Sequence, residues 1–408
     1  MHRLPVIAIL AVTFAVVTLH SLPAEAQGFA TITSPLRVPL HWRSVDDDPT
    51  KPRKLGLYAT IGGGTTPQLF EFDTGGDGLY ASYATGTAAP WWGGGYTPIA
   101  GGTFSQVYDS GLTYTGTAVT TSISLFASGT AGSPLLTATD VVVGLTFGMT
   151  QPGSGTLWPL PSGTSPPPTN GAFFGDFGMA PKQGQSGIDS LVAQMAYGAG
   201  VAAGFRVHAA SESPWVQFGL TAGDLAVLPT TFALNTAIGS SAAGVPYYQP
   251  LVVTGSLDVQ KDNAPFAQPT GLVFDTGAST TIHNSGTNGP FPAHLTKDHA
   301  GTEVVHNASF TVSGSSLAPG GGWQTMIQLT TGGVTDVDKV EVQFSPLNPD
   351  YYLNTGILPF MQHDIIFNLA AGQLTLAAVP EPTSLGLTAL GGLAALGWTM
   401  LRQRVWRR

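Results

Sequence analysis

The sequence predicts an all-β protein built from two related lobes, and three observations support this fold class. Short runs of alternating or β-branched apolar residues recur between clusters of Gly, Pro, Asn and Ser, a pattern typical of strands joined by turns. Segments with helical periodicity are few. The tetrapeptide Phe-Asp-Thr-Gly occurs twice, at 72–75 and at 274–277, once in each half of the chain. This repeat indicates an internal duplication with a shared site where the two halves meet.

The strand-like runs define the elements that we expect. They cover 54–61, 69–72, 117–126, 141–147, 205–208, 252–259, 340–344 and 365–376, the last with a turn at Gly372. The segment 187–199 is the best candidate for a helix in the body of the protein. The stretch 151–170 contains three consecutive prolines at 166–168 and shows no periodicity, which predicts a long surface loop.

Composition limits the class of protein. The 408 residues are enough for one large or two medium domains with buried cores. Only 10% are charged, against about a quarter in ordinary domains, and the 53 glycines and 31 prolines suit a turn-rich β protein. The net charge of −9, with basic residues clustered only at the C-terminal end, argues against a nucleic-acid partner. The chain has no cysteine, which excludes disulfides and thiolate metal sites.

Residues 1–26 have the pattern of a secretory signal peptide. The pair His-Arg at 2–3 precedes an almost wholly apolar stretch at 4–19, and Ala-Glu-Ala at 24–26 is a small-x-small cleavage site. We therefore expect the mature chain to begin at Gln27, outside the cytoplasmic membrane. The alternative is an uncleaved membrane anchor.

Residues 379–408 have the pattern of a second sorting segment. Val-Pro-Glu-Pro at 379–382 precedes an apolar stretch at 385–401, and four arginines follow. Counted from Thr383, the segment is just long enough for a transmembrane helix, which takes about 20 residues, and the arginines would stay cytoplasmic. This order resembles the PEP-CTERM sorting signal of Gram-negative bacteria. The resemblance implies bacterial origin, transient membrane anchoring, removal of the tail by an exosortase-type enzyme, and release to the cell surface or extracellular polymer. The alternative is a permanent single-pass anchor.

The N-terminal half of the body carries a series of motifs in a definite order. A first hairpin at 57–62 leads to the Asp-Thr-Gly loop at 72–75, and Val-Tyr-Asp-Ser-Gly follows at 107–111. An apolar-apolar-Gly element comes next, at 177–180 or, one step earlier, at 173–175. This order resembles the first half of the pepsin-like aspartic peptidases, and the resemblance implies that Val-Tyr-Asp-Ser-Gly belongs to the flap hairpin that covers the cleft.

The second half continues the same resemblance. It repeats the loop at 272–277 and adds segments similar to the closing strands at 354–357 and 365–374. The resemblance covers nearly the whole mature body and implies a bilobal acid-protease fold with few short helices. The expected domains are an N-terminal lobe at 27–211 and a C-terminal lobe at 212–378, with the site in the cleft between them.

The resemblance also implies a site and an activity. Asp73 and Asp275 would form the catalytic pair of a secreted or surface-sorted aspartic endopeptidase that hydrolyses a peptide or protein substrate through an activated water. It implies a monomer that works without metal or cofactor. The residues expected to bind substrate are Tyr108 of the flap and the loop residues Thr74, Gly75, Gly76, Thr276, Gly277 and Ala278.

Two facing carboxylates suit this chemistry because they cannot both ionise cheaply. The pKa of one is lowered and that of the other raised, and the pair titrates as a unit. With one shared proton, the ionised partner can activate a water while the neutral partner protonates the scissile carbonyl oxygen. A threonine after each aspartate can bond across the two loops, and the glycine that follows lets the loops approach closely.

Several assignments have a plainer alternative. The two repeated aspartates could cap backbone amides in separate turns, and Tyr114 could replace Tyr108 as the flap residue. Asp77, Asp109 and Asp176 are interpreted as turn residues.

A possible metal site lies further along the chain. His294 and His299, with Asp298 between them, could be proposed as metal ligands, but their loose spacing in a loop favours a solvated segment.

Two departures from the family pattern bear on activity. The residue after each loop glycine is usually a hydroxyl that hydrogen-bonds the outer oxygen of its aspartate, but here these residues are Gly76 and Ala278. Loss of both donors is expected to raise the apparent pKa of the pair and slow turnover. Little chain precedes the first matched strand, although Lys51, Arg53 and Lys54 could form a short blocking arm. These departures favour a rival function, a non-catalytic pepsin-like surface protein that binds a protein or extracellular polymer. A structural component of the extracellular matrix is a third hypothesis.

Overall fold

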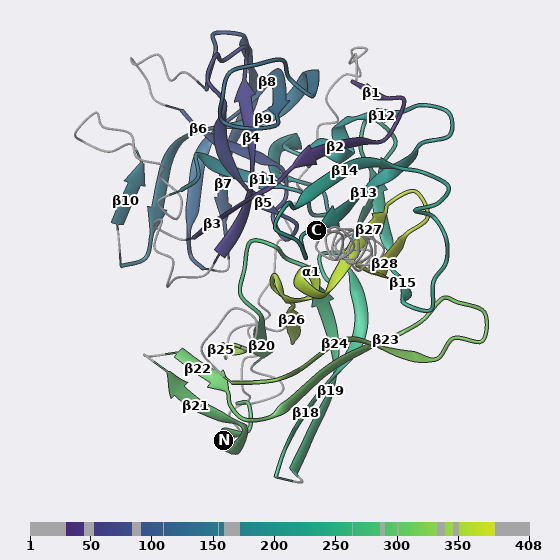
Figure 1. Ribbon diagram of the computed structural model, residues 1–408. Helices are drawn as coiled ribbons and strands as arrows, with labels where there is room; N and C mark the ends of the chain where they lie inside the picture. The colour runs from purple at the N-terminus through teal and green to yellow at the C-terminus, as the bar shows by residue number, and fades with distance from the viewer. Residues whose placement is uncertain are drawn as a thin grey trace, which may run out of the picture.

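β-Strands form most of the described chain, which confirms the all-β prediction. Figure 1 shows purple and blue strands at the top of the molecule and green strands at the bottom, with teal and yellow strands beside and between them. The computed structural model describes residues 30–44, 53–83, 91–108, 110–153, 155–158, 172–262, 264–285, 290–299, 302–332, 339–345 and 351–379.

The N-terminal lobe is built on a nine-stranded sheet. Its members are β3 (His41–Ser44), β4 (Arg53–Ile61), β5 (Gln68–Asp73), β6 (Leu79–Ser82), β7 (Tyr96–Val107), β8 (Thr113–Phe126), β9 (Leu136–Gln151), β10 (Gly155–Trp158) and β11 (Gly175–Gly178). The order across the sheet is β10-β9-β6-β11-β5-β4-β8-β7, with β3 beside β4. β11 lies between β5 and β6, parallel to β5 and antiparallel to β6. The far-separated segment 175–178 is thereby placed against the strand that ends at Asp73.

The C-terminal lobe repeats this arrangement. Its nine strands are β18 (Val253–Lys261), β19 (Ala264–Val273), β20 (Thr281–Ser285), β21 (Thr296–His299), β22 (Thr302–Val305), β23 (Ser309–Ser315), β24 (Trp323–Thr330), β25 (Glu341–Ser345) and β26 (Tyr352–Asn354). They are ordered β21-β22-β25-β20-β26-β19-β18-β23-β24. β26 lies between β19 and β20, parallel to β19, as β11 lies between β5 and β6. β25 runs parallel to β20, as β9 does to β6. The duplication indicated by the repeated tetrapeptide is therefore a duplication of the sheet.

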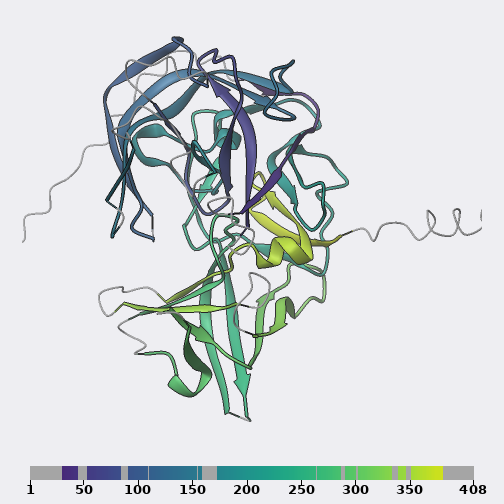
Figure 2. The same cartoon turned by 60° about the vertical axis from the view of Figure 1, so that its left-hand side comes forward.

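A six-stranded sheet joins the two parts of the chain. It consists of β2 (Leu36–Pro39), β13 (Ala202–His208), β14 (Trp215–Leu220), β15 (Thr231–Ala233), β27 (His363–Asn368) and β28 (Gln373–Ala378), in the order β15-β28-β27-β13-β14-β2. Two small sheets pair β1 (Thr31–Ile32) with β12 (Ala196–Tyr197) and β16 (Ala237–Ser240) with β17 (Pro246–Tyr248). In the turned view of Figure 2, the yellow strands of the six-stranded sheet lie between the upper and lower lobes. The expected boundary between 211 and 212 falls between the paired strands β13 and β14.

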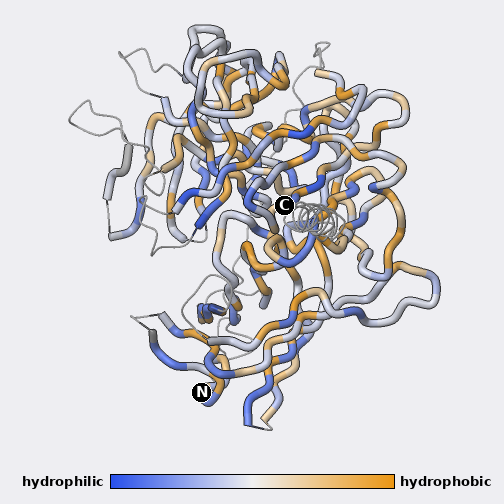
Figure 3. Tube along the Cα trace, in the orientation of Figure 1, coloured by the Kyte–Doolittle hydropathy of each residue, from blue (hydrophilic) through white to orange (hydrophobic). Residues whose placement is uncertain are grey.

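The core follows the alternation that strands require. Long strands such as β8 and β18 alternate buried and more exposed residues, because successive side chains point to opposite faces of a sheet. Figure 3 shows the corresponding mixture of hydrophobic and hydrophilic stretches in both lobes. Under the first Asp-Thr-Gly loop, Phe70, Phe72 and Phe177 are fully buried. Burial of such side chains contributes about 1.5–3 kcal/mol each, so the loop rests on a rigid base.

The helix expected at 187–199 is wrong. The segment contains the end of a 3₁₀ turn, η2 (Gln185–Gly187), then η3 (Leu191–Gln194), and Met195 is already extended. The side chain of Gln194 explains the interruption, because its amide accepts from the N–H of Val142 at 2.6 Å and donates to the carbonyl of Val142 at 3.0 Å. This tertiary pairing with β9 competes with helical periodicity. The α-helix of the described chain is α1 (Leu358–Gln362), and η4 (Ala293–Leu295) is a further 3₁₀ turn.

The long loop expected at 151–170 is wrong at its start. Gly155–Trp158 forms β10, which pairs with the end of β9 around a turn. Residues 159–171 lie outside the described residues, as do the expected signal peptide at 1–26, Asp109, and the sorting tail apart from Val379. Within the ranges that the structure describes, no helix is long and apolar enough to cross a membrane.

Candidate functional site: paired aspartates at the lobe junction

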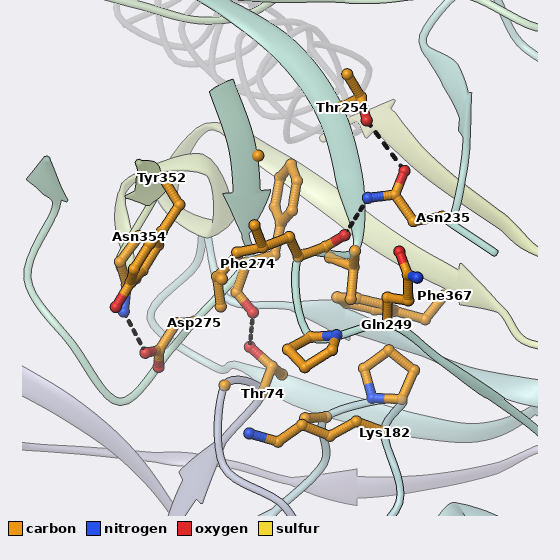
Figure 4. A pocket seen from close by; sticks show the side chains of 18 residues that line it. Thr74, Lys182, Asn235, Gln249, Thr254, Phe274, Asp275, Tyr352, Asn354 and Phe367 are labelled. Carbon is orange, nitrogen blue, oxygen red and sulfur yellow. Dashed lines mark hydrogen bonds between the residues drawn. The ribbon is translucent and has the colours of Figure 1, made fainter. Parts of the chain in front are cut away.

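Two loops, one from each lobe, are joined by their threonines. The N–H of Thr74 donates to Oγ1 of Thr276 at 3.1 Å, and the N–H of Thr276 donates to Oγ1 of Thr74 at 3.0 Å. The Thr74 hydroxyl donates to the carbonyl of Phe274 at 2.8 Å, a bond drawn in Figure 4. The Thr276 hydroxyl donates to the carbonyl of Phe72 at 2.6 Å. The four bonds are reciprocal, so each loop fixes the position of the other.

The glycines of the loops allow an unusually close approach. A Cβ placed on Gly75 would lie 2.4 Å from Cγ of Asp275, and a Cβ on Gly277 would lie 2.6 Å from Cγ of Asp73. Real Cβ atoms do not approach other atoms so closely, so only glycine fits at either position. Each aspartate therefore lies against the loop of the opposite lobe.

Backbone donors fix the inner carboxylate oxygens. The N–H of Gly75 donates to Oδ1 of Asp73 at 2.8 Å, and the N–H of Gly277 donates to Oδ1 of Asp275 at 2.7 Å. Both aspartates are buried, with exposed fractions of 8% and 9%. On the C-terminal side, Nδ2 of Asn354 adds a bond of 2.6 Å to Oδ2 of Asp275 (Figure 4). The N–H of Gly356 donates to Oδ1 of Asn354 at 2.9 Å, which orients the amide with its nitrogen toward the carboxylate.

The electrostatics of the pair favour retention of one proton. Burial, the charge of Asp73 and a hydrogen bond with Asp73 raise the pKa of Asp275 well above its usual value, against the donors of Asn354 and Gly277. The raised pKa means that the carboxyl group of Asp275 keeps its proton to a higher pH than an exposed aspartic acid does. The arrangement can hold one neutral and one ionised carboxyl group at weakly acidic pH, which is the state needed for combined acid and base catalysis.

Tyr108 lies in the turn of the β7–β8 hairpin. Its hydroxyl donates to Oδ2 of Asp176 at 2.5 Å, and it lines a cavity of about 400 Å³ together with Asp73 and Asp275. Tyr114, the alternative flap residue, is fully buried and its ring lies edge-on to that of Tyr108 at a centroid distance of 5.2 Å. Both tyrosines line this cavity, and the hydroxyl of Tyr108 reaches a carboxyl group beside the pair.

A second cavity, of about 750 Å³, reaches the same loops from the segments 180–182 and 249–252 (Figure 4). Gly75, Asp275 and Lys182 line both cavities. The loops therefore lie where the two cavities meet. Volumes of this size are typical of ligand sites. Asp275 lines both cavities, whereas Asp73 lines the smaller one.

The positions after the loop glycines lack side-chain donors, as the sequence indicates. A Cβ on Gly76 would lie 2.7 Å from Oδ2 of Asp73 and 2.7 Å from Oδ2 of Asp176. Ala278 lines the smaller cavity. With Thr74, Gly75, Thr276 and Gly277 described above, all the residues expected at the site lie on or beside the two loops.

The interpretation of Asp176 as a turn residue is wrong. It lies in β11, is 3% exposed, and has its Oδ2 in contact with Tyr108. The local sequence at 176–178 does not reveal this position, because the place of Asp176 beside the loop depends on the pairing of β11 with β5. The sequence analysis placed Asn354 only in a segment similar to a closing strand. Its contact with Asp275 depends on the pairing of β19 with β26, which local sequence patterns do not predict.

The residues considered for a blocking arm and for a metal site do not form either feature in the described chain. Lys54 lies in β4 and forms an ion pair with Glu71, on the neighbouring β5, so it does not belong to a separate blocking arm. Both residues line the smaller cavity. His294 lies in η4, and among the described residues there is no group of three or more His, Cys, Asp or Glu that could hold a metal ion.

The fold has counterparts among solved structures. The crystal structure of an aspartic proteinase from Irpex lacteus matches with a TM-score of 0.50 and 16% sequence identity, over 86% of this chain and 99% of that chain. Basic 7S globulin from soybean matches with a TM-score of 0.49 and 11% identity, over 85% of this chain and 95% of that chain. No protein-family model and no curated protein matches the sequence. The chain has the bilobal fold of the pepsin-like proteins.

Proposed function

We propose that the protein is an aspartic endopeptidase that binds an extended peptide at the junction of its lobes and hydrolyses it through Asp73 and Asp275. The observation that carries this proposal is the reciprocal pairing of Thr74 and Thr276, which brings the two aspartates together. Turn aspartates that only cap local amides would not need such a link between loops 200 positions apart. The fold is compatible with this activity but does not decide it.

The proposed mechanism uses one proton on the pair. The ionised carboxylate accepts a proton from a water, and the water attacks the scissile carbonyl carbon. The neutral carboxyl group gives its proton to the carbonyl oxygen as the tetrahedral intermediate forms. The C–N bond then breaks as the carboxyl group that took the proton from water gives it to the leaving nitrogen, while the other carboxylate takes back a proton from a hydroxyl of the intermediate, which restores one proton on the pair. The hydrogen bonds from Gly75 and Gly277 hold both groups in position, and such positioning supplies a further part of the rate.

A second candidate function is a non-catalytic binding protein whose cleft holds a protein or extracellular polymer. Gly76 and Ala278 favour it, because neither offers the hydroxyl donor that commonly supports the aspartates. The same two cavities would then bind a chain without cleaving it.

Export and sorting form a separate part of the proposal. The basic-apolar-small pattern of residues 1–26 supports export across the inner membrane, with Gln27 as the new N-terminus. The order of residues 379–408 supports transient anchoring and processing by an exosortase-type enzyme of a bacterial cell. Terminal sequencing of the protein recovered from culture medium and from membranes would test both points. Retention of residues 1–26 or of the arginine cluster in the released form would contradict them.

The activity is tested by incubating the purified full-length protein with a denatured protein between about pH 3 and about pH 7, with and without pepstatin. The proposal predicts cleavage at acidic pH that pepstatin abolishes. Binding of the denatured protein without cleavage at any pH would favour the second candidate.

A further inference from the structure

A third carboxyl group lies beside the aspartate pair, on the N-terminal side. In the parallel β11–β5 register, Asp176 is aligned with Glu71 and Gly178 with Asp73. Because side chains alternate along a strand, Asp176, Glu71 and Asp73 project from the same face of the sheet, away from the buried Phe72 and Phe177.

The contacts of Asp176 are incomplete. Its Oδ2 accepts the hydroxyl of Tyr108 at 2.5 Å, whereas Oδ1 is buried and has no hydrogen-bond partner among the described residues. A residue that is only 3% exposed would not normally keep a carboxyl group with an unpaired oxygen. An unpaired buried oxygen lowers the stability of the fold, so stability does not explain why an aspartate occupies this position.

Gly76 shows how close this carboxyl group is to the pair. A Cβ at position 76 would lie 2.7 Å from Oδ2 of Asp73 and equally 2.7 Å from Oδ2 of Asp176. The two oxygens are thus neighbours of the same point, which a side chain at 76 would occupy. The carboxyl group of Asp176 takes up the space that the missing side chain leaves.

The other lobe has a matching residue. Val273 is aligned with Asn354 on β19 and β26, as Glu71 is aligned with Asp176 on β5 and β11. Asn354 donates to Oδ2 of Asp275 at 2.6 Å. The equivalent position in each lobe therefore lies beside the outer oxygen of its own aspartate, with an amide in one lobe and a carboxyl group in the other.

The charges around Asp176 favour its neutral form. Burial raises the pKa of Asp176 well above its usual value, and so do the charges of Asp73, Glu71 and Asp77, while the bond from Tyr108 acts in the opposite direction. The nearby ammonium of Lys54 is paired with Glu71 and also interacts with Asp73 and Asp275. The buried phenol of Tyr80 also interacts with Asp176. A neutral Asp176 can donate a hydrogen bond, as Asn354 does.

We propose that Asp176, oriented by Tyr108, is a positioning residue of the proposed peptidase: its protonated carboxyl group donates to the outer oxygen of Asp73, in place of the side chain absent at Gly76. The inference rests on the proposed function. Asp73, Asp275 and Asp176 then share two protons, with Asp73 ionised. Loss of the proton from Asp176 places a further negative charge beside the carboxylate of Asp73. Activity therefore falls on the alkaline side when Asp176 ionises.

The test compares pH profiles of kcat/KM for the parent, Asp176→Asn and Asp176→Ala. Asp176→Ala removes the donor, and we expect its maximum to fall by about 10- to 100-fold, as for loss of a hydrogen bond to a charged group. Asp176→Asn keeps a donor and cannot ionise. It should recover part of that loss, and its alkaline limb should extend to higher pH than that of the parent. A purely structural role for Asp176 would leave the position of the alkaline limb unchanged.

A serine at position 76 should have effects of different size in two backgrounds. Gly76→Ser should reduce activity in the parent, because its side chain collides with both carboxyl groups. In Asp176→Ala only the collision with Asp73 remains, and the serine supplies a hydroxyl donor there, so Gly76→Ser should reduce activity less than it does in the parent. Asp258→Asn, at an exposed position on β18, is the matched control and should behave as the parent. Equal losses from Gly76→Ser in both backgrounds would overturn the proposal.

Carbon-13 NMR of labelled aspartate carboxyl groups separates this inference from the proposed function. The resonance lost in Asp176→Asn should titrate well above the ordinary range, and Asp73→Asn should lower its pKa by removing a neighbouring charge. If the parent cleaves peptide but Asp176 titrates in the ordinary range, the positioning role alone is wrong. If the parent cleaves nothing at any pH, the proposed function is wrong and the positioning role fails with it.

Discussion

Thr74 and Thr276 each bind the backbone of the other's loop, so that neither aspartate is positioned by its own lobe alone. Each hydroxyl accepts one N–H and donates to one carbonyl of the opposite loop. Both threonines are almost fully buried, so water cannot replace these partners. The junction of the lobes and the geometry of the pair are thus fixed by the same four hydrogen bonds.

Thr74→Val should disrupt this link while keeping the shape of the side chain. It leaves the N–H of Thr276 and the carbonyl of Phe274 buried and unpaired, which should lower the free energy of unfolding by about 2–4 kcal/mol. Urea denaturation measures this change. Thr74→Ser keeps the hydroxyl and is the matched control. Equal stability of the valine and serine variants would show that the link contributes nothing.

Gly277→Ala should separate the loops. The new Cβ would lie 2.6 Å from Cγ of Asp73, so the backbone must shift, at a cost of about 1–3 kcal/mol in stability. Peptidase activity should fall by about 100-fold or more, because small displacements of catalytic groups have large effects on rate. Gly322→Ala, where no atom lies within 4 Å of the added Cβ, should leave activity and stability unchanged. An active Gly277→Ala protein would mean that the loops are less closely packed than described.

Lys54→Met should leave Glu71 without its ion-pair partner beside the aspartate pair. Burial lowers the pKa of Lys54, but the charge and hydrogen bond of Glu71, together with the charges of Asp73 and Asp275, outweigh burial and keep this pKa above its usual value. The ammonium is therefore charged throughout the acidic range. Its loss should reduce the free energy of unfolding at neutral pH by about 1–3 kcal/mol. Thermal unfolding should show that the double variant Lys54→Met/Glu71→Met regains most of this loss, since the buried carboxylate of Glu71 is removed together with the ammonium that pairs with it. A double variant as unstable as the single one would contradict this reasoning.

Asp275→Asn should change the pH dependence of stability. The pKa of Asp275 is raised in the folded protein, so its contribution to stability is fully present below the unfolded value of 3.8 and is lost as pH rises through the folded value. Asparagine does not ionise and avoids that loss. The variant should therefore have a higher Tm than the parent at about pH 7 and a similar Tm at about pH 3. A variant less stable than the parent at neutral pH would contradict a repelling pair.

The strands and the positions of the two aspartates could be predicted from the sequence, because both depend on local patterns. Alternation of apolar residues gave β8 and β18, and the repeated tetrapeptide gave Asp73 and Asp275, because these signals are local in the chain. The role of Asp176 was not readable, since it depends on the alignment of β11 with β5, more than 100 positions earlier.

The helices were predicted less well than the strands, because contacts with distant strands and short length hide the helical pattern. The helix expected at 187–199 was replaced by 3₁₀ turns because Gln194 bonds to Val142 on another strand. The helix α1 has only five residues, too few to give a periodic signal. Local patterns therefore predicted the elements, while contacts between distant strands determined the site around the pair.

The measurement that most directly tests the central claim is the peptidase activity of Asp73→Asn and Asp275→Asn at the pH optimum of the parent. Each substitution keeps the shape of the side chain and removes one ionisable group of the pair. Activity should fall by several orders of magnitude in both, since general acid–base catalysis alone contributes about 10²- to 10⁴-fold, whereas Asp258→Asn should retain parental activity. If either variant at the pair cleaves peptide as fast as the parent, the aspartate pair is not the catalytic site.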